Sequence, residues 1–194
     1  RKAITLGIDR QAIVDSLLEG KTTVPVSQWP NSSWENSSLT PDAYDADGAA
    51  ALLEEAGYTL GADGIRHGDC NGTDTKLSFN FETTTSQIRI DIATIVQSDL
   101  AKIGVEFKPI HTPAGTFFGS YTDGGVMPTG KYDMAGYTTG FYPDPYSDNY
   151  KCESVPNAAQ PDGTNWYLNC DPTLSDMVEE VNASADPAVR KEKL

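Results

Sequence analysis

The sequence has few of the side chains that carry out catalysis. It contains 2 histidines and 3 cysteines among 194 residues. No serine stands in a Gly-x-Ser-x-Gly turn, and no phosphate-binding or dinucleotide-binding glycine motif precedes a predicted helix. His67 and Cys70 have the spacing of half a zinc site, but no matching second pair follows. We therefore expect no enzyme activity, no metal site and no cofactor.

Positive charge and long apolar runs are also scarce. Lys and Arg number 14 against 28 Asp and Glu, so the formal net charge is -14 at pH 7. Such a surface repels phosphate backbones, and nucleic acid is not an expected partner. No run approaches the eighteen or so apolar residues of a membrane-spanning helix. The sequence lacks a signal peptide and an initiator Met, and we interpret it as a piece cut from a longer protein.

Two of the three cysteines flank one polar loop. Cys152 and Cys170 enclose a stretch rich in Pro, Asn and Gly, and they are either bridged or two separate thiols. A bridge would close a loop of about 19 residues and stabilise the fold by about 3 kcal/mol. Because a long polar loop has no core of its own, we predict the disulfide, and with it an oxidising compartment. Cys70 is then free or pairs outside this sequence.

The hydrophobic pattern predicts alternating helices and strands. Asp9 and Asp45 are expected as N-caps, and Gly20 and Gly57 as helix ends. The helix from Ser86 is expected to turn its apolar residues inward, namely Ile88, Ile92, Ile95, Val96, Leu100 and Ile103. Helices are predicted at 1–19, 46–56, 86–103, 117–121, 173–183 and from 187, strands at 76–83, 105–110 and 132–137, and an extended segment at 21–44. The strand–helix–strand order favours a parallel, right-handed crossover, and the predicted class is α/β.

Five stretches carry patterns that occur together in one family. They are RKAITLGIDRQAIVDSLLEG at 1–20, YDADGAAALLEEAGY at 44–58, IATIVQSDLAKIGVEFK at 92–108, KYDMAGYTTGFYPDP at 131–145, and LNCDPTLSDMVEEVNASADPAVRKEKL at 168–194. In this order and spacing they resemble solute-binding proteins of the peptide/nickel class (family 5) of ABC importers. The resemblance covers nearly the whole chain and is confined to the C-terminal lobe of that family.

The resemblance implies the type II periplasmic-binding-protein fold, in which an N-terminal lobe and this C-terminal lobe close on a ligand about a hinge. It implies that residues 1–194 form a single domain, the C-terminal ligand-binding lobe, with a mixed sheet flanked by helices. It implies capture of an oligopeptide or a related solute, such as an oligosaccharide, for import by a membrane permease and ATPase subunits. It places the protein outside the cytoplasm, in the periplasm or as a lipoprotein on the outer face of the cell membrane. A ligand-sensing receptor ectodomain with the same fold remains an alternative, as does an enzyme whose second half-site lies in the other lobe.

The family lines its cleft with the segment that follows the Tyr-Asp strand. In peptide-binding relatives an Asp there pairs with the ligand's ammonium group, and a Trp precedes it. Counting back from Asp144, Phe141 holds the place of that Asp, Tyr142 matches a Tyr, and Thr138 or Tyr137 holds the place of the Trp. We expect all five residues to bind ligand, with core packing as the alternative for Tyr137 and a turn role for Asp144. Aromatic residues without the acid suit sugar rings or an uncharged section of a peptide.

Overall fold

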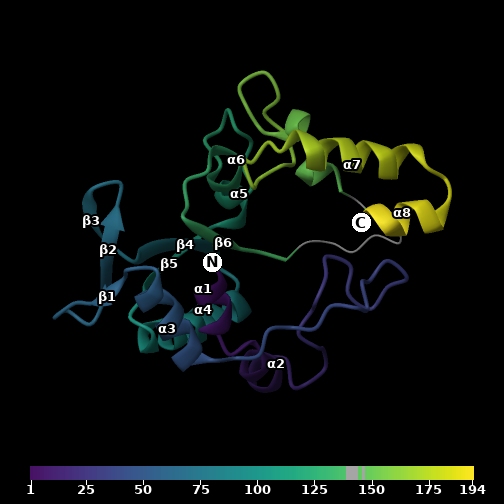
Figure 1. Ribbon diagram of the computed structural model, residues 1–194. Helices are drawn as coiled ribbons and strands as arrows, with labels where there is room; N and C mark the ends of the chain where they lie inside the picture. The colour runs from purple at the N-terminus through teal and green to yellow at the C-terminus, as the bar shows by residue number, and fades with distance from the viewer. Residues whose placement is uncertain (139–143, 146) are drawn as a thin grey trace. The chain divides into compact units, whose positions relative to one another are not determined.

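The computed structural model describes residues 1–138, 144–145 and 147–194, which form two compact units (Figure 1). Unit 1 comprises Arg1–Val26, Ser38–His111 and Asp133–Tyr137. Unit 2 comprises Ser27–Ser37, Thr112–Tyr132 and Thr138–Leu194. Each unit therefore combines segments that are distant in the sequence. The assignment of residues 1–194 to one lobe of a longer protein stays a prediction.

Two of the first three helices of unit 1, α2 and α3, begin at aspartate caps. Helix α1 spans Lys2–Leu6, α2 spans Arg10–Leu17 and α3 spans Ala46–Glu55. The carboxylate of Asp9 accepts a hydrogen bond from the backbone N–H of Ala12, and that of Asp45 accepts one from Gly48. Both caps were predicted and are confirmed, because each oxygen satisfies an amide that has no partner inside its helix.

A three-stranded antiparallel sheet in unit 1 was not predicted. Strand β1 spans Thr59–Leu60, β2 spans Arg66–Cys70 and β3 spans Thr73–Lys76, in the order β1-β2-β3. Asn71 and Gly72 join β2 to β3 with φ values of 53° and 79°, as a two-residue hairpin turn requires. Most side chains of β2 and β3 are polar, so these strands lack the alternation by which a half-buried strand is recognised.

The second sheet of unit 1 carries its hydrophobic core. Strand β4 (Ser78–Thr84) is central, β5 (Glu106–Thr112) lies on one side, and β6 (Met134–Gly136) lies parallel to β4 on the other. Helix α4 (Gln87–Lys102) connects β4 to β5. The predicted strands are confirmed with shifted ends. The buried core residues are Ala3, Ala49, Leu53, Ala93, Leu100, Ile103, Val105 and Phe107.

One predicted core position on α4 is wrong. Ile88 keeps 38% of its surface exposed, whereas Leu100 near the other end of the helix is completely buried. The reason is position along the helix. Ile88 lies in the first turn, and the buried residues begin with Ala93. An apolar stripe predicts which face of a helix packs, but it does not predict how far the neighbouring elements extend along it.

Unit 2 consists of helices and connecting loops. Helix α5 spans Ala114–Phe117 and α6 spans Val126–Thr129, and the 3-10 helices η1 and η2 span Asp148–Tyr150 and Cys152–Ser154. Helix α7 spans Pro172–Ala183 and α8 spans Pro187–Lys193. The helix predicted at 117–121 instead ends at Phe117, because Pro113 begins the helix earlier. Phe117 is completely buried and packs edge-on against Phe118, with ring centroids 4.7 Å apart.

The predicted α/β class is confirmed, with helices and strands combined in unit 1 and helices at the end of unit 2. Asp171 caps α7 and Asp186 caps α8, and a proline follows each cap. Among the described residues, no helix has the length and apolar character of a membrane span.

Candidate functional site

The carboxyl ends of β4 and β6 form a polar edge in unit 1. The two strands are parallel, with Thr83 opposite Gly136, and the Thr83 Oγ1 donates a hydrogen bond to the Gly136 carbonyl oxygen at 2.6 Å. Thr84 is also buried, and Arg89 at the start of α4 donates to its Oγ1 at 2.5 Å. Ligands of α/β sheets bind outside the carboxyl ends of the strands. This edge is therefore a candidate for the ligand-facing side of unit 1.

Sequence reasoning missed these residues. The signal that would have found them is the Thr-Thr-Thr run at 83–85, between a predicted strand and a predicted helix. Three hydroxyls at the end of a strand provide hydrogen-bonding groups where a sheet usually meets its ligand.

The structure describes three of the five predicted ligand-binding residues, namely Tyr137, Thr138 and Asp144. Tyr137 directly follows β6 in unit 1 and is half-buried, and Thr138 begins the last segment of unit 2 and is exposed. Phe141 and Tyr142 lie outside the described residues. Asp144 is exposed. A ligand-binding role for all five stays a prediction.

Asp144 forms an ion pair within unit 2. Its Oδ1 accepts a hydrogen bond from the Arg190 Nη1 at 2.6 Å, and the guanidinium group holds the pKa of the Asp144 carboxyl below its ordinary value. The Arg190 side chain is 15% exposed, and its guanidinium carbon lies 5.2 Å from the centroid of the Trp34 ring. Asp144 was predicted to hold a turn or to contact ligand. Its carboxylate is already paired with Arg190, which lies over the Trp34 ring.

Further contacts hold the segment Ser27–Ser37 to the rest of unit 2. Lys191 Nζ donates to the Ser33 carbonyl oxygen at 2.8 Å, and Tyr150 Oη donates to the Gln28 Oε1 at 2.9 Å. Together with the stacking of Arg190 on Trp34, they join this segment to η1 and α8. The partners lie more than a hundred positions apart in the sequence, so no local pattern indicates them.

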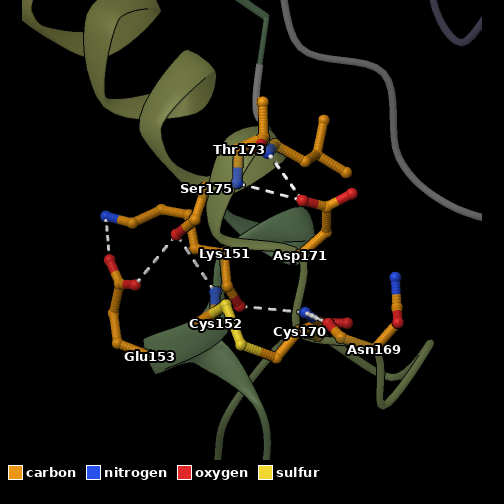
Figure 2. Close-up of a disulfide and its surroundings, with 10 residues drawn as sticks. Lys151, Cys152, Glu153, Asn169, Cys170, Asp171, Thr173 and Ser175 are labelled. Carbon is orange, nitrogen blue, oxygen red and sulfur yellow. Dashed lines mark hydrogen bonds and ion pairs between the residues drawn. A yellow bond between two sulfur atoms is a disulfide. The ribbon is translucent and has the colours of Figure 1, made fainter.

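The disulfide predicted between Cys152 and Cys170 is present (Figure 2). It joins η2 to the residue that precedes Asp171, the cap of α7. The backbone N–H of Cys152 also donates to the Ser175 Oγ at 3.2 Å. The bridge and this hydrogen bond attach η2 to the first turn of α7, so the polar loop that they close has both ends fixed. Cys70 is an exposed free thiol in unit 1.

Acidic side chains surround the lysine beside the bridge. Lys151 Nζ pairs with Glu153 at 2.7 Å and also with Glu179 of α7, and the side chain of Lys151 is only 15% exposed. The hydrogen bonds with Glu153 and then Glu179 raise the pKa of Lys151. The amide of the buried Asn165 donates to the Lys151 carbonyl oxygen at 2.9 Å. These contacts assign the loop a structural role beside the disulfide.

The histidine that could belong to a zinc site has carboxylate neighbours instead. His67 Nε2 lies 3.4 Å from an Asp63 carboxylate oxygen, and His67 Nδ1 lies 3.3 Å from one of Asp74. Across residues 1–138, 144–145 and 147–194, no group of three His, Cys, Asp or Glu side chains has a geometry that could hold a metal ion.

Residues 1–160 match the family described as bacterial extracellular solute-binding proteins, family 5 Middle. The chain belongs to this family. The resemblance noted in the sequence is thereby confirmed, and the family is one of solute-binding proteins.

Two curated relatives illustrate the range of ligands. The chain is 29% identical over 125 residues to the nickel-binding periplasmic protein of Escherichia coli (strain K12), an alignment that covers 64% of the chain and 24% of the relative. It is 34% identical over 113 residues to the oligopeptide-binding protein AppA of Bacillus subtilis (strain 168), covering 56% of the chain and 20% of the relative. The matched part is therefore a quarter or less of each relative's length.

Solved structures share the fold over the whole chain. The oligopeptide-binding protein of Thermus thermophilus, complexed with a pentapeptide, superposes with a TM-score of 0.84 at 21% identity, covering 100% of this chain and 34% of that one. An oligopeptide ABC transporter binding protein of Thermotoga maritima, bound to mannohexaose, gives a TM-score of 0.73 at 20% identity, covering 99% and 36%. The predicted periplasmic-binding-protein fold is thus confirmed.

Proposed function

We propose that the chain is the C-terminal ligand-binding lobe of an extracytoplasmic substrate-binding protein that captures oligopeptides, or a related solute such as an oligosaccharide, for an ABC importer. The observation that carries the proposal is the family match over residues 1–160. The relatives' own ligands, peptide in one solved structure and mannohexaose in another, support the range of solutes. The partners are the N-terminal lobe of the same protein and the permease and ATPase subunits in the membrane. The protein acts in the periplasm or on the outer face of the cell membrane.

The segment after β6 is the part of the lobe that contacts ligand. It follows the carboxyl end of a parallel strand pair, where a second lobe can close over it. Tyr137, Thr138, Phe141 and Tyr142 supply one polar and three aromatic side chains, which bind mainly by stacking and burial. The lobe contributes no catalytic step, and the energy for uptake comes from the ATPase.

A ligand can bind to this segment without a free amino terminus. The place of the ammonium-pairing acid is held by Phe141, and the nearby carboxylate of Asp144 is engaged by Arg190 at 2.6 Å. A ligand ammonium would have to compete with a guanidinium group whose side chain is only 15% exposed and is stacked on Trp34. An uncharged section of a peptide or a sugar ring meets no such competition.

Binding to the intact protein tests the proposal. The ligand is first identified by mass spectrometry of the small molecules that co-purify with the protein. Calorimetry then compares wild type with Phe141→Ala and Tyr142→Ala, and with Tyr121→Ala as the control, a partly exposed tyrosine elsewhere in unit 2. We expect weaker binding in the first two variants, with an unchanged melting temperature, and unchanged binding in the control.

Three outcomes would contradict parts of the proposal. If Phe141→Ala and Tyr142→Ala bind the ligand as tightly as wild type, the segment after β6 is not part of the binding site. For a peptide ligand, a large loss of affinity on acetylation of its amino terminus would show that an acid, in Asp144 or in the other lobe, binds the ammonium group. Turnover of the captured solute by the purified protein would favour the enzyme alternative.

A further inference from the structure

Four Asn-x-Ser/Thr triplets occur in the sequence, and they begin at Asn31, Asn36, Asn71 and Asn182. In proteins that are exported from the cytoplasm, such a triplet on a surface loop is an acceptor for N-linked sugar. A transferase must reach both the amide nitrogen of the Asn and the hydroxyl of the third residue. The contacts of each triplet in the folded chain therefore decide which of them can serve as an acceptor.

Two of the triplets begin in the segment that is held to the rest of unit 2. In the Asn31 triplet, the carbonyl oxygen of the third residue, Ser33, accepts a hydrogen bond from Lys191 Nζ at 2.8 Å. Asn36, at the start of the next triplet, also interacts with another group of the protein. Both triplets are thus engaged within the fold.

The Asn182 triplet lies at the C-terminal end of α7. Its Nδ2, the atom that would take up a sugar, donates a hydrogen bond to Asp148 Oδ1 of η1 at 2.8 Å. Transfer of a sugar would break this bond and would place a bulky group between two elements that contact each other. This triplet is therefore a poor acceptor in the folded protein.

The remaining triplet, Asn71–Thr73, lies at the tip of the β2–β3 hairpin. Asn71 and Gly72 form the two-residue turn, and the backbone N–H of Gly72 donates to the Asp69 Oδ1 at 3.0 Å. All residues from 69 to 74 are exposed, and the tip lies away from the other elements of unit 1 (Figure 1). Within residues 1–138, 144–145 and 147–194, no hydrogen bond engages the side chain of Asn71 or the hydroxyl of Thr73. The turn thus presents both groups of the triplet to solvent.

We propose that Asn71 is an N-glycosylation site, which accepts an oligosaccharide from a lipid-linked sugar phosphate outside the cytoplasm. The Asn71 Nδ2 would form a bond to C1 of the first sugar, and the bond between C1 and the phosphate oxygen would break. The lipid phosphate leaves, and the amide proton passes to a base of the transferase. The strands on either side of the turn are mainly polar, so a hydrated sugar chain displaces no apolar contact there. The inference rests on the proposed function, because that function places the protein outside the cytoplasm.

Mass spectrometry of the full-length protein, purified from the organism that produces it, tests the site. The protein is taken from the fraction outside the cytoplasmic membrane, digested, and fragmented by electron transfer, which keeps a sugar on its peptide. We expect a sugar mass on Asn71 and none on the other three triplets. Exported protein with an unmodified Asn71, or with equal occupancy of all four triplets, would overturn this inference alone. Protein found only in the cytoplasm would contradict the proposed function as well.

Substitutions in the turn test whether the triplet itself is recognised. Asn71→Asp removes the acceptor nitrogen but keeps a residue that tolerates the left-handed turn, and it should lose the sugar completely. Thr73→Ala should also lose the sugar although Asn71 is intact, whereas Thr73→Ser should keep it, because a hydroxyl remains. The matched control is Asn182→Asp, which should leave the sugar in place. Wild-type occupancy in Thr73→Ala would overturn the proposal, and Thr73→Val replaces this variant if circular dichroism shows that it does not fold.

Discussion

Removing the disulfide should destabilise unit 2 selectively. Cys152 and Cys170 are 18 positions apart, and the double substitution to serine restores the entropy of that loop to the unfolded chain. The chain-entropy relation gives a loss of about 3 kcal/mol in the free energy of unfolding for a loop of this length. In a chain of this size, that corresponds to a fall of roughly 6–12 °C in melting temperature. The loss should fall on η2 and the start of α7, because the bridge joins them.

Tryptophan fluorescence during denaturant unfolding measures this effect where it is expected. The chain has 3 tryptophans, at positions 29, 34 and 166, and all of them lie in unit 2. The control is Cys70→Ser, which removes an exposed thiol of unit 1 and should change stability by no more than about 0.5 kcal/mol. Mass spectrometry of a non-reduced digest would verify the bridge in the wild type. Loss of less than about 1 kcal/mol in the double variant would refute the loop-entropy reasoning.

Three further predictions concern the ion pair, the core and the proposed second lobe. The carboxyl of Asp144 has a lowered pKa, so its pairing with Arg190 stabilises unit 2 above the ordinary value of 3.8 and is lost as pH falls through the lower folded value. Asp144→Asn should therefore lower the melting temperature at pH 7. In thermal scans at decreasing pH, the melting temperatures of variant and wild type should converge below pH 3.8. A difference in melting temperature that stays constant with pH would contradict this. Leu100→Ala should lower the free energy of unfolding by about 2–5 kcal/mol, as followed by circular dichroism, because Leu100 is completely buried. Ile88→Ala on the same helix should change it by about 0.5 kcal/mol or less. Equal losses in the two variants would contradict the burial pattern. By calorimetry, the 194-residue chain should bind the natural ligand far more weakly than the intact protein, because the proposed function gives it one wall of a two-walled site. Equal affinities would place the whole site in this chain.

Features that depend on residues close in sequence could be predicted from the sequence. Asp9 and Asp45 were recognised as caps because a capping carboxylate bonds to an amide three residues ahead. The strands around α4 were recognised from apolar alternation, and the disulfide from a polar loop between two cysteines. The family followed from the order of five motifs along the chain. Each of these signals lies within a short stretch, so it can be read before the chain folds.

Features that depend on distant residues were decided only by the tertiary structure. The hairpin of β2 and β3 has polar strands, so what identifies it is cross-strand hydrogen bonding rather than a pattern of side chains. Arg190 is separated from Asp144 by 46 positions, and it meets Trp34 from an even greater distance in sequence, because packing of α8 places the three together. The same packing leaves the hydroxyl of Ser147 buried beside α7. The sequence determines which charged and polar side chains the protein has. Which partner each of them meets is decided by tertiary packing, because packing brings distant segments together and removes water from between them.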